Sequence, residues 1–208
     1  MAEVLSLERP RVAPDLILRL QKYKNLDAVP APLRHAADAM AALAGSLVEP
    51  QGRLVRTPVR RLESGGAVLL ADGTCFRSRA LARLLYGARE VILFLLTLGP
   101  RLETRAQELM GEEQYLEALL LDTAAWVAMD AMAKTLRERL SAEARAEGMR
   151  LTHRMAPGYV DWRLEEQRIL FSAFDHEALP VRLTEACVML PRKSISGIYG
   201  LIPAEYKP

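Results

Sequence analysis

The sequence predicts a single α+β domain, because its strand-like and helix-like segments occur in blocks and do not alternate as they do in a βαβ series. Two strand-like segments, residues 53–62 and 67–70, flank a Gly-Gly turn, which is typical of a β-hairpin. An apolar run at residues 90–97 has the length and composition of a buried central strand. A long helical pattern follows, from residue 101 to about residue 140.

We expect residues 1–50 to form a helical N-terminal segment of the same domain and residues 51–208 to form its core. Two short helices are predicted in the N-terminal segment, over residues 15–23 and 33–47, because prolines interrupt the helical pattern between them. In the hairpin, Pro58 favours an edge position for its strand, since proline cannot donate a hydrogen bond to a neighbouring strand.

The remaining elements are predicted from capping residues and from apolar spacing. Ser78 is expected to cap a helix that ends at Gly87, and the long helical pattern has a candidate break near Gly111. A further helix is predicted over residues 161–174, with Leu164, Ile169, Leu170 and Phe174 facing inward. Residues 184–190 and 194–201 are candidate late strands.

Composition and charge exclude several classes of protein. Half of the 208 residues are hydrophobic, which is enough for a sizeable core, and a net charge of +2 argues against a nucleic-acid binder. Cys75 and Cys187 lie far apart and outside any metal-binding spacing, so we expect no metal site. Two free thiols are typical of a cytoplasmic protein, so we expect a cytoplasmic location. The N-terminus lacks an apolar signal core, and the longest apolar run, residues 91–98, is too short to span a membrane.

The most apolar part of the long helix, residues 118–133, contains two acids. Its composition predicts burial on all sides, and Asp122 and Asp130 would lie about 80° apart around the helix axis. A carboxylate in such a helix needs a partner. For Asp130 that partner is either Lys134, four residues later, or a cationic ligand, whereas Asp122 is expected to be a structural acid.

The sequence Arg154-Met155-Ala156-Pro157-Gly158-Tyr159 is the clearest motif of the chain. Gly158 permits a left-handed turn or a close approach of a ligand, Arg154 offers a planar fork that suits a carboxylate, and Tyr159 offers an aromatic face and a hydroxyl. A second block follows at residues 183–185 and 189–197, in which Leu190-Pro191 precedes Lys193-Ser194-Ile195-Ser196-Gly197. Taken alone, the first block also fits a simple turn between two packed elements.

Together the two blocks, in this order, resemble the activation domain of cobalamin-dependent methionine synthase, in its free-standing form. The resemblance covers about residues 78–200 and implies a mixed or antiparallel twisted sheet packed by helices. It also implies a site for S-adenosylmethionine (AdoMet), in which the R-x-x-x-G-Y turn holds the ligand.

The resemblance assigns roles in that site to particular residues. Arg154 would bind the carboxylate of AdoMet, Ala156 would offer backbone groups to the adenine, and Gly158 and Tyr159 would complete the turn. Asp130 stands where the family usually has a glutamate that contacts the ligand. A tyrosine after the last motif also touches AdoMet in the family, and Tyr206 is the candidate here. No side chain is expected to act as a general acid or base.

The resemblance further implies a function and its partners. The chain would support reductive methylation of cob(II)alamin carried by a corrinoid-binding methionine synthase, or by a related corrinoid protein. An external donor such as a flavodoxin or ferredoxin would supply the electron. The alternative is a non-catalytic chaperone or cap of a corrinoid protein that does not bind AdoMet. A group of arginines forms either a solvated face or a docking face for an acidic partner such as that donor: Arg53, Arg56, Arg60, Arg61, Arg77, Arg79, Arg83 and Arg89.

Overall fold

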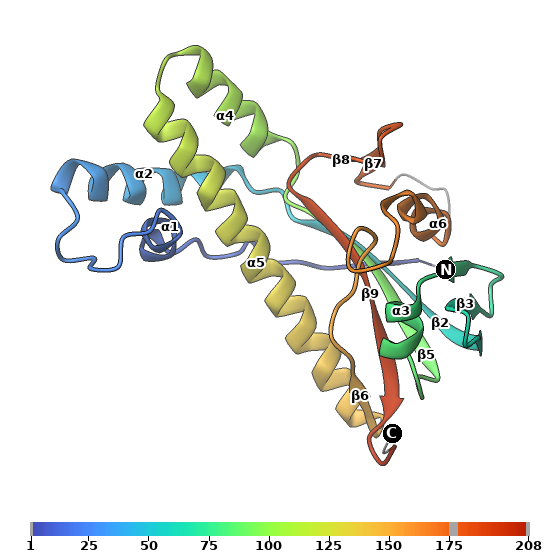
Figure 1. Cartoon of the computed structure of the whole chain (residues 1–208). Helices are drawn as coiled ribbons and strands as arrows, with labels where there is room; N and C mark the ends of the chain where they lie inside the picture. Colours follow the sequence, from blue (N-terminus) through green and yellow to red (C-terminus); the bar gives the residue numbers. More distant parts are fainter. Residues whose placement is uncertain (1, 175–178, 207–208) are drawn as a thin grey trace.

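A twisted antiparallel sheet forms the centre of the molecule (Figure 1). The computed structural model describes residues 2–174 and 179–206. Across those residues the strand order is β4-β3-β2-β5-β9-β6, and β1 pairs with β2 beside this path. The strands are β1 (Glu3–Val4), β2 (Gln51–Leu62), β3 (Ala67–Leu70), β4 (Cys75–Arg77), β5 (Glu90–Thr97), β6 (Met149–Leu151) and β9 (Ser194–Pro203). The chain is therefore an α+β domain with an antiparallel sheet, as the sequence predicts.

The apolar run of β5 is explained by its central position. β5 pairs with β2 on one side and with β9 on the other along its whole length. Successive side chains of a strand point to opposite faces. Phe94 and Leu96 accordingly join the core on one face of the sheet, while Leu93 and Leu95 join the core on the other. Both faces are covered, so the strand is apolar throughout, and the predicted central strand is confirmed.

The expected edge position of Pro58 is wrong. β2 lies inside the sheet, where Gln51–Pro58 pairs with β5 and Val59–Leu62 pairs with β3. Pro58 stands at the change of partner, and the register of the β2–β3 pair shifts between Val59 and Arg61. A proline is tolerated there because such irregularities interrupt the regular ladder of backbone hydrogen bonds.

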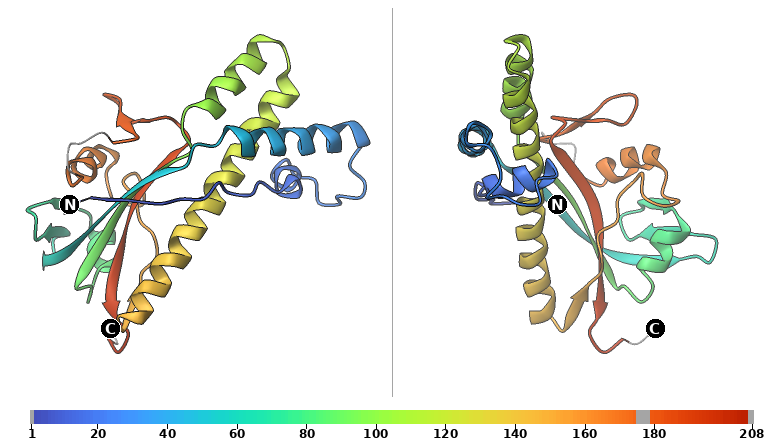
Figure 2. Two further views of the ribbon diagram at one scale, coloured as in Figure 1. Left: turned by 180° about the vertical axis from the view of Figure 1, so that it is seen from behind. Right: turned by 60° about the vertical axis from the view of Figure 1, so that its left-hand side comes forward.

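Helices cover both faces of the sheet (Figure 2). One face carries the long helix α5, which crosses the sheet diagonally, and α1, α2 and α4 pack against α5. The other face carries α3 and α6. Their bounds are α1 (Pro14–Leu20), α2 (Ala31–Leu47), α3 (Arg79–Leu84), α4 (Arg101–Gly111), α5 (Tyr115–Ala146) and α6 (Gln167–Ser172).

Local capping explains several helix ends. The hydroxyl of Ser78 accepts a hydrogen bond from the amide of Leu81 at the start of α3, and Gly87 follows that helix with a positive φ of 80°, as predicted. The carboxylate of Asp161 adds a second cap, since it accepts hydrogen bonds from Ser78 Oγ and from the amide of Arg79. The predicted break near Gly111 is confirmed by the end of α4.

Two predictions for the C-terminal third are wrong. Residues 161–174 do not form one helix: a 3₁₀ turn (Leu164–Glu166) precedes the short α6, and Leu164 is exposed, because Trp162 and Leu170 already fill the core there. Residues 184–190 do not form one strand either. Only β7 (Arg182–Leu183) and β8 (Met189–Leu190) pair, and a tight turn between residues 184 and 188 separates them.

None of the helices within the described ranges combines the length and the apolar composition needed to cross a bilayer.

Candidate functional site

One stripe of α5 is exposed, although the sequence predicts that this part of the helix is buried on all sides. Asp122, Trp126 and Asp130 recur every four residues and all three are exposed, whereas most of their neighbours pack against the sheet or the other helices. Burial on all sides is a wrong prediction for this part of α5. Residues four apart share a face of a helix, and this face lines hollows at the surface, so it is not covered by other elements. Trp126, with 55% of its surface exposed, belongs to this stripe, although the apolar composition of residues 118–133 predicts that it is buried.

Asp130 does not form an ion pair with Lys134, which is one of the two alternative partners that the sequence allows for it. The ammonium of Lys134 lies 4.0 Å from a carboxylate oxygen of Glu138, and within the described part of the chain no ion pair includes Asp130. The side chain of Asp130 is exposed and lines a hollow beside the sheet. Its carboxylate is therefore accessible to a ligand.

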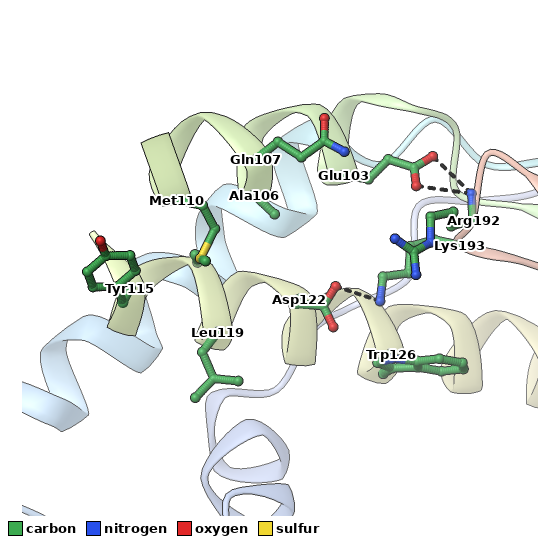
Figure 3. A pocket seen from close by; sticks show the side chains of 11 residues that line it. Glu103, Ala106, Gln107, Met110, Tyr115, Leu119, Asp122, Trp126, Arg192 and Lys193 are labelled. Atoms are coloured by element: carbon green, nitrogen blue, oxygen red, sulfur yellow. Dashed lines mark hydrogen bonds and ion pairs between the residues drawn. The ribbon is translucent and has the colours of Figure 1, made fainter. Parts of the chain in front are cut away.

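Asp122 forms an ion pair, in agreement with its expected structural role. Its carboxylate lies 2.7 Å from the ammonium of Lys193, whose side chain is only 10% exposed (Figure 3). The same ammonium lies 4.8 Å from the ring centroid of Trp126, which is a cation–π distance. Lys193 thus joins the turn before β9 to the exposed stripe of α5.

The motif between Arg154 and Tyr159 forms a tight turn beside β9. Met155 pairs with Ile198, and this bridge holds the start of the motif against the sheet. Gly158 has a φ of +91°, which is the left-handed turn, one of the two roles that the sequence allows for it. Its amide donates to the carbonyl of Trp162 at 2.7 Å. The carbonyl of Ala156 accepts a hydrogen bond from the amide of Tyr159 at 3.1 Å, so it closes the turn.

Arg154 and Tyr159 contact each other directly. The guanidinium donates to the phenolic oxygen at 2.9 Å, and its central carbon lies 5.7 Å from the ring centroid. Tyr159 is 47% exposed, so the pair stands at the surface of the turn. This contact fixes the direction in which the fork of Arg154 points.

The structure brings Arg154 and Asp130 into one pocket of about 370 Å³, between α5 and β9. Tyr199 and Trp126 form aromatic walls of this pocket. Its remaining lining residues are Met129, Ala133, Lys134, Arg137 and Ile195. We call it the Asp130–Arg154 pocket. Ala156, Gly158 and Tyr159 do not line it, although Tyr159 touches Arg154.

The tyrosine in the pocket is Tyr199, not Tyr206. Tyr206 packs closely on Gly87, and its ring centroid lies 6.2 Å from that of Tyr86, beyond the far end of β9. Tyr199 is buried, stacks on Phe94, and has a pKa raised above the ordinary value, mainly by burial. Its position directly after Ser196-Gly197-Ile198 is a sequence signal that could have identified it.

Two comparisons with known proteins agree with this architecture. The crystal structure of the MetH reactivation domain bound to AdoHcy is similar over the whole of this chain and 80% of that one, with a TM-score of 0.70 and 16% sequence identity. That likeness shows an activation-domain fold. The family model described as "Vitamin B12 dependent methionine synthase, activation domain" matches residues 86–206, more than half of the chain. The chain belongs to this family. No curated protein matches the sequence.

Proposed function

We propose that this chain binds AdoMet in the Asp130–Arg154 pocket and supports the reductive methylation of a corrinoid held by a partner, a methionine synthase or a related corrinoid protein. The observation that carries this proposal is that Asp130 and Arg154, which lie on different elements, line the same pocket. The family supports the activating role, and a related fold has been solved with AdoHcy bound.

The charges of the two residues suit the anionic and the cationic groups of AdoMet. Arg154 can bind the carboxylate of the ligand through two parallel hydrogen bonds. Asp130 can stand near the amino group or the sulfonium, both of which are cationic. The rings of Trp126 and Tyr199 offer apolar walls, and an aromatic face attracts a cation.

The contribution of the chain to the reaction is positioning. A bound corrinoid, reduced by one electron from an external donor, would supply the nucleophilic cobalt; the methyl group would leave the sulfur of AdoMet, AdoHcy would be released, and no side chain of this chain would need to move a proton. The pocket would hold the methyl donor in a fixed direction beside the surface from which the corrinoid approaches. Trp126 lines the pocket and is exposed, and Tyr159, which contacts Arg154, is also exposed. The surface beside the pocket is therefore accessible to a partner.

A reconstituted methylation assay tests the proposal. The chain is mixed with a corrinoid protein in the cob(II) state, a low-potential reductant and AdoMet, and the absorbance of methylcobalamin is followed. The proposal expects methylation that depends on both the chain and AdoMet. If methylation proceeds equally fast without the chain, the activating role is excluded for that partner.

One observation favours the chaperone as a second candidate. The pocket contains three bases, Lys134, Arg137 and Arg154, and a single acid, Asp130. An excess of positive charge disfavours a ligand that carries a sulfonium. Calorimetry separates the two candidates, because a chaperone without a ligand gives no binding heat with AdoMet.

We propose an acidic electron-transfer protein as the electron donor. Several of the arginines at the hairpin and α3 are exposed, which suits an acidic protein such as a flavodoxin or ferredoxin. Arg56 is already held by Glu90 and by Glu147, with the latter pair at 2.6 Å, and Arg61 lies 3.4 Å from Glu63. A docking face would therefore depend on the remaining arginines of this group.

A further inference from the structure

Lys193 is a buried base that the proposed function does not use. It stands directly before β9, and its backbone is tied to the end of β5. Its carbonyl accepts hydrogen bonds from the amide of Leu98 at 3.0 Å and from the hydroxyl of Thr97 at 3.4 Å. The next residue, Ser194, donates a hydrogen bond to the hydroxyl of Thr97 at 2.8 Å. The side chain of Lys193 therefore starts from a fixed position at the edge of the sheet.

The ammonium of Lys193 lies between an acid and an aromatic ring of α5 (Figure 3). Asp122, at 2.7 Å, and Trp126, whose ring centroid is at 4.8 Å, are four residues apart and share one face of the helix. A charge that is almost entirely removed from water needs such partners. Because Asp122 cancels the charge of the lysine, the contact with Trp126 adds little net charge beside the Asp130–Arg154 pocket.

Trp126 is the residue on which this contact acts. Its ring is a wall of the Asp130–Arg154 pocket, of a hollow between α4 and α5, and of another hollow between α1 and α5. Since the side chain is 55% exposed, the surrounding packing holds it only in part. A long side chain on a helix has two common χ1 rotamers, which direct it differently over the helix surface. The rotamer of Trp126 therefore decides the shape of the hollows that meet at its ring.

We propose that Lys193 is a positioning residue of the Asp130–Arg154 pocket, because it holds the indole of Trp126 in the orientation that the ligand requires. This inference rests on the proposed function, since the ligand in question is AdoMet. Lys193 does not itself line the pocket and acts through Trp126. Trp126 stands one turn before Asp130 on the exposed stripe of α5, so a change of its rotamer moves the wall beside this acid.

The positioning role predicts an effect opposite in sign to that of charge alone. AdoMet carries a sulfonium, an ammonium and a carboxylate, so its net charge is positive. If Coulomb repulsion alone mattered, removing the charge of Lys193 would strengthen the binding of this ligand. If Lys193 positions Trp126, the same change weakens binding, because the wall of the pocket must then be ordered when the ligand binds.

Calorimetry with AdoMet, combined with fluorine NMR of the full chain labelled with fluorotryptophan, tests the proposal. The chain has two tryptophans, and Trp126→Phe assigns their resonances. Lys193→Met removes the charge and keeps an unbranched side chain. We expect it to move the Trp126 resonance and to lower the affinity for AdoMet about three- to tenfold. Lys193→Arg should restore most of both, because a guanidinium can also pair with Asp122 and stack on the ring.

Arg192→Met is the matched control. Arg192 is the neighbouring base in the same turn and is exposed, and its amide, which the substitution keeps, donates hydrogen bonds to Glu103. The change removes one positive charge close to Lys193 but leaves the cation over the indole in place. It should neither move the Trp126 resonance nor weaken AdoMet binding. Asp122→Asn should move the resonance in the same direction as Lys193→Met, because it releases the ammonium from its acid.

A double-mutant cycle shows whether Lys193 acts through Trp126. In the Trp126→Ala background, Lys193→Met should cause no further loss of AdoMet affinity, because the ring that it positions is gone. The proposal is overturned if Lys193→Met in the wild-type background leaves the affinity unchanged or raises it. It is also overturned if Arg192→Met weakens binding equally, or if the loss in Lys193→Met persists without Trp126.

The two measurements separate this proposal from the proposed function. If the wild type gives no binding heat with AdoMet, the proposed function is contradicted, and with it the role of Lys193 toward that ligand. The fluorine resonance still decides whether Lys193 orients the indole. Movement in Lys193→Met but not in Arg192→Met supports this contact, and an unmoved resonance in Lys193→Met overturns it.

Discussion

The guanidinium of Arg154 donates a hydrogen bond to the hydroxyl of Tyr159 at 2.9 Å and lies against its ring. The two ends of the R-x-x-x-G-Y motif therefore hold each other, and the motif is a closed unit and not only a turn. The arginine of this unit lines the Asp130–Arg154 pocket, whereas its tyrosine stands outside at the surface. The two residues should therefore contribute to different steps.

Tyr159→Ala should slow corrinoid methylation more than it weakens AdoMet binding, because Tyr159 is exposed at the surface from which we propose that the partner approaches. The measurements are the rate of methylcobalamin formation and the calorimetric affinity for AdoMet. Tyr159→Phe is the control for the hydrogen bond to Arg154, since it keeps the ring. Equal losses of rate and affinity in Tyr159→Ala would make Tyr159 a plain ligand contact.

Asp130→Asn should weaken AdoMet binding more than it lowers the free energy of unfolding. Asp130 is exposed, so the fold depends little on its charge. Glu138→Gln serves as the control and should leave the affinity nearly unchanged, because Glu138 is an exposed acid of the same helix that does not line the pocket. A loss of thermal stability in Asp130→Asn without a loss of affinity would assign this acid to the fold.

Tyr199 and Tyr206 should respond differently to truncation. Tyr199→Ala should lower the affinity for AdoMet, since its ring is a wall of the pocket, and should destabilise the fold by about 3–5 kcal/mol because the ring is buried. Tyr206→Ala should leave the affinity unchanged. Both affinities are measured below the unfolding transition of the weaker variant. A loss of affinity in Tyr206→Ala alone would restore Tyr206 to the site.

Asp161 should stabilise the fold in a pH-dependent way. Its pKa is lowered, first by the hydrogen bond from Ser78 and then by the amides of Ala80 and Arg79. A carboxyl group whose pKa is lower in the folded state stabilises it above the unfolded pKa. This stabilisation is lost as the pH falls through the folded pKa. Urea unfolding across acidic pH should show a smaller pH dependence in Asp161→Asn than in the wild type.

The sequence predicts the parts of this fold that local chemistry determines. The apolar run of β5, the Ser78 cap of α3 and the left-handed Gly158 follow from residue type and spacing. The partner change of β2 at Pro58 could not be predicted, because it depends on strands that are distant along the chain. The exposure of Trp126 has a similar cause: composition gives the apolar character of α5 but not which stripe the sheet leaves uncovered.

The sequence predicts some residues of the candidate site but not how they come together. The motif predicts a role for Arg154 and the family resemblance predicts one for Asp130, but only the fold brings these residues into one pocket. The pairing of Asp122 with Lys193 joins residues that are far apart in the sequence, so no local pattern could indicate it. The sequence offers Tyr206 as the candidate tyrosine, whereas the tyrosine that lines the pocket is Tyr199.

Calorimetric titration of the chain with AdoMet tests the central claim most directly. The wild type should bind AdoMet at one saturable site. Arg154→Ala should lose about 2–4 kcal/mol of binding free energy, because the carboxylate of the ligand would lose its charged hydrogen-bond partner. The absence of binding heat with the wild type, or an unchanged affinity in Arg154→Ala, would contradict an AdoMet site in the Asp130–Arg154 pocket.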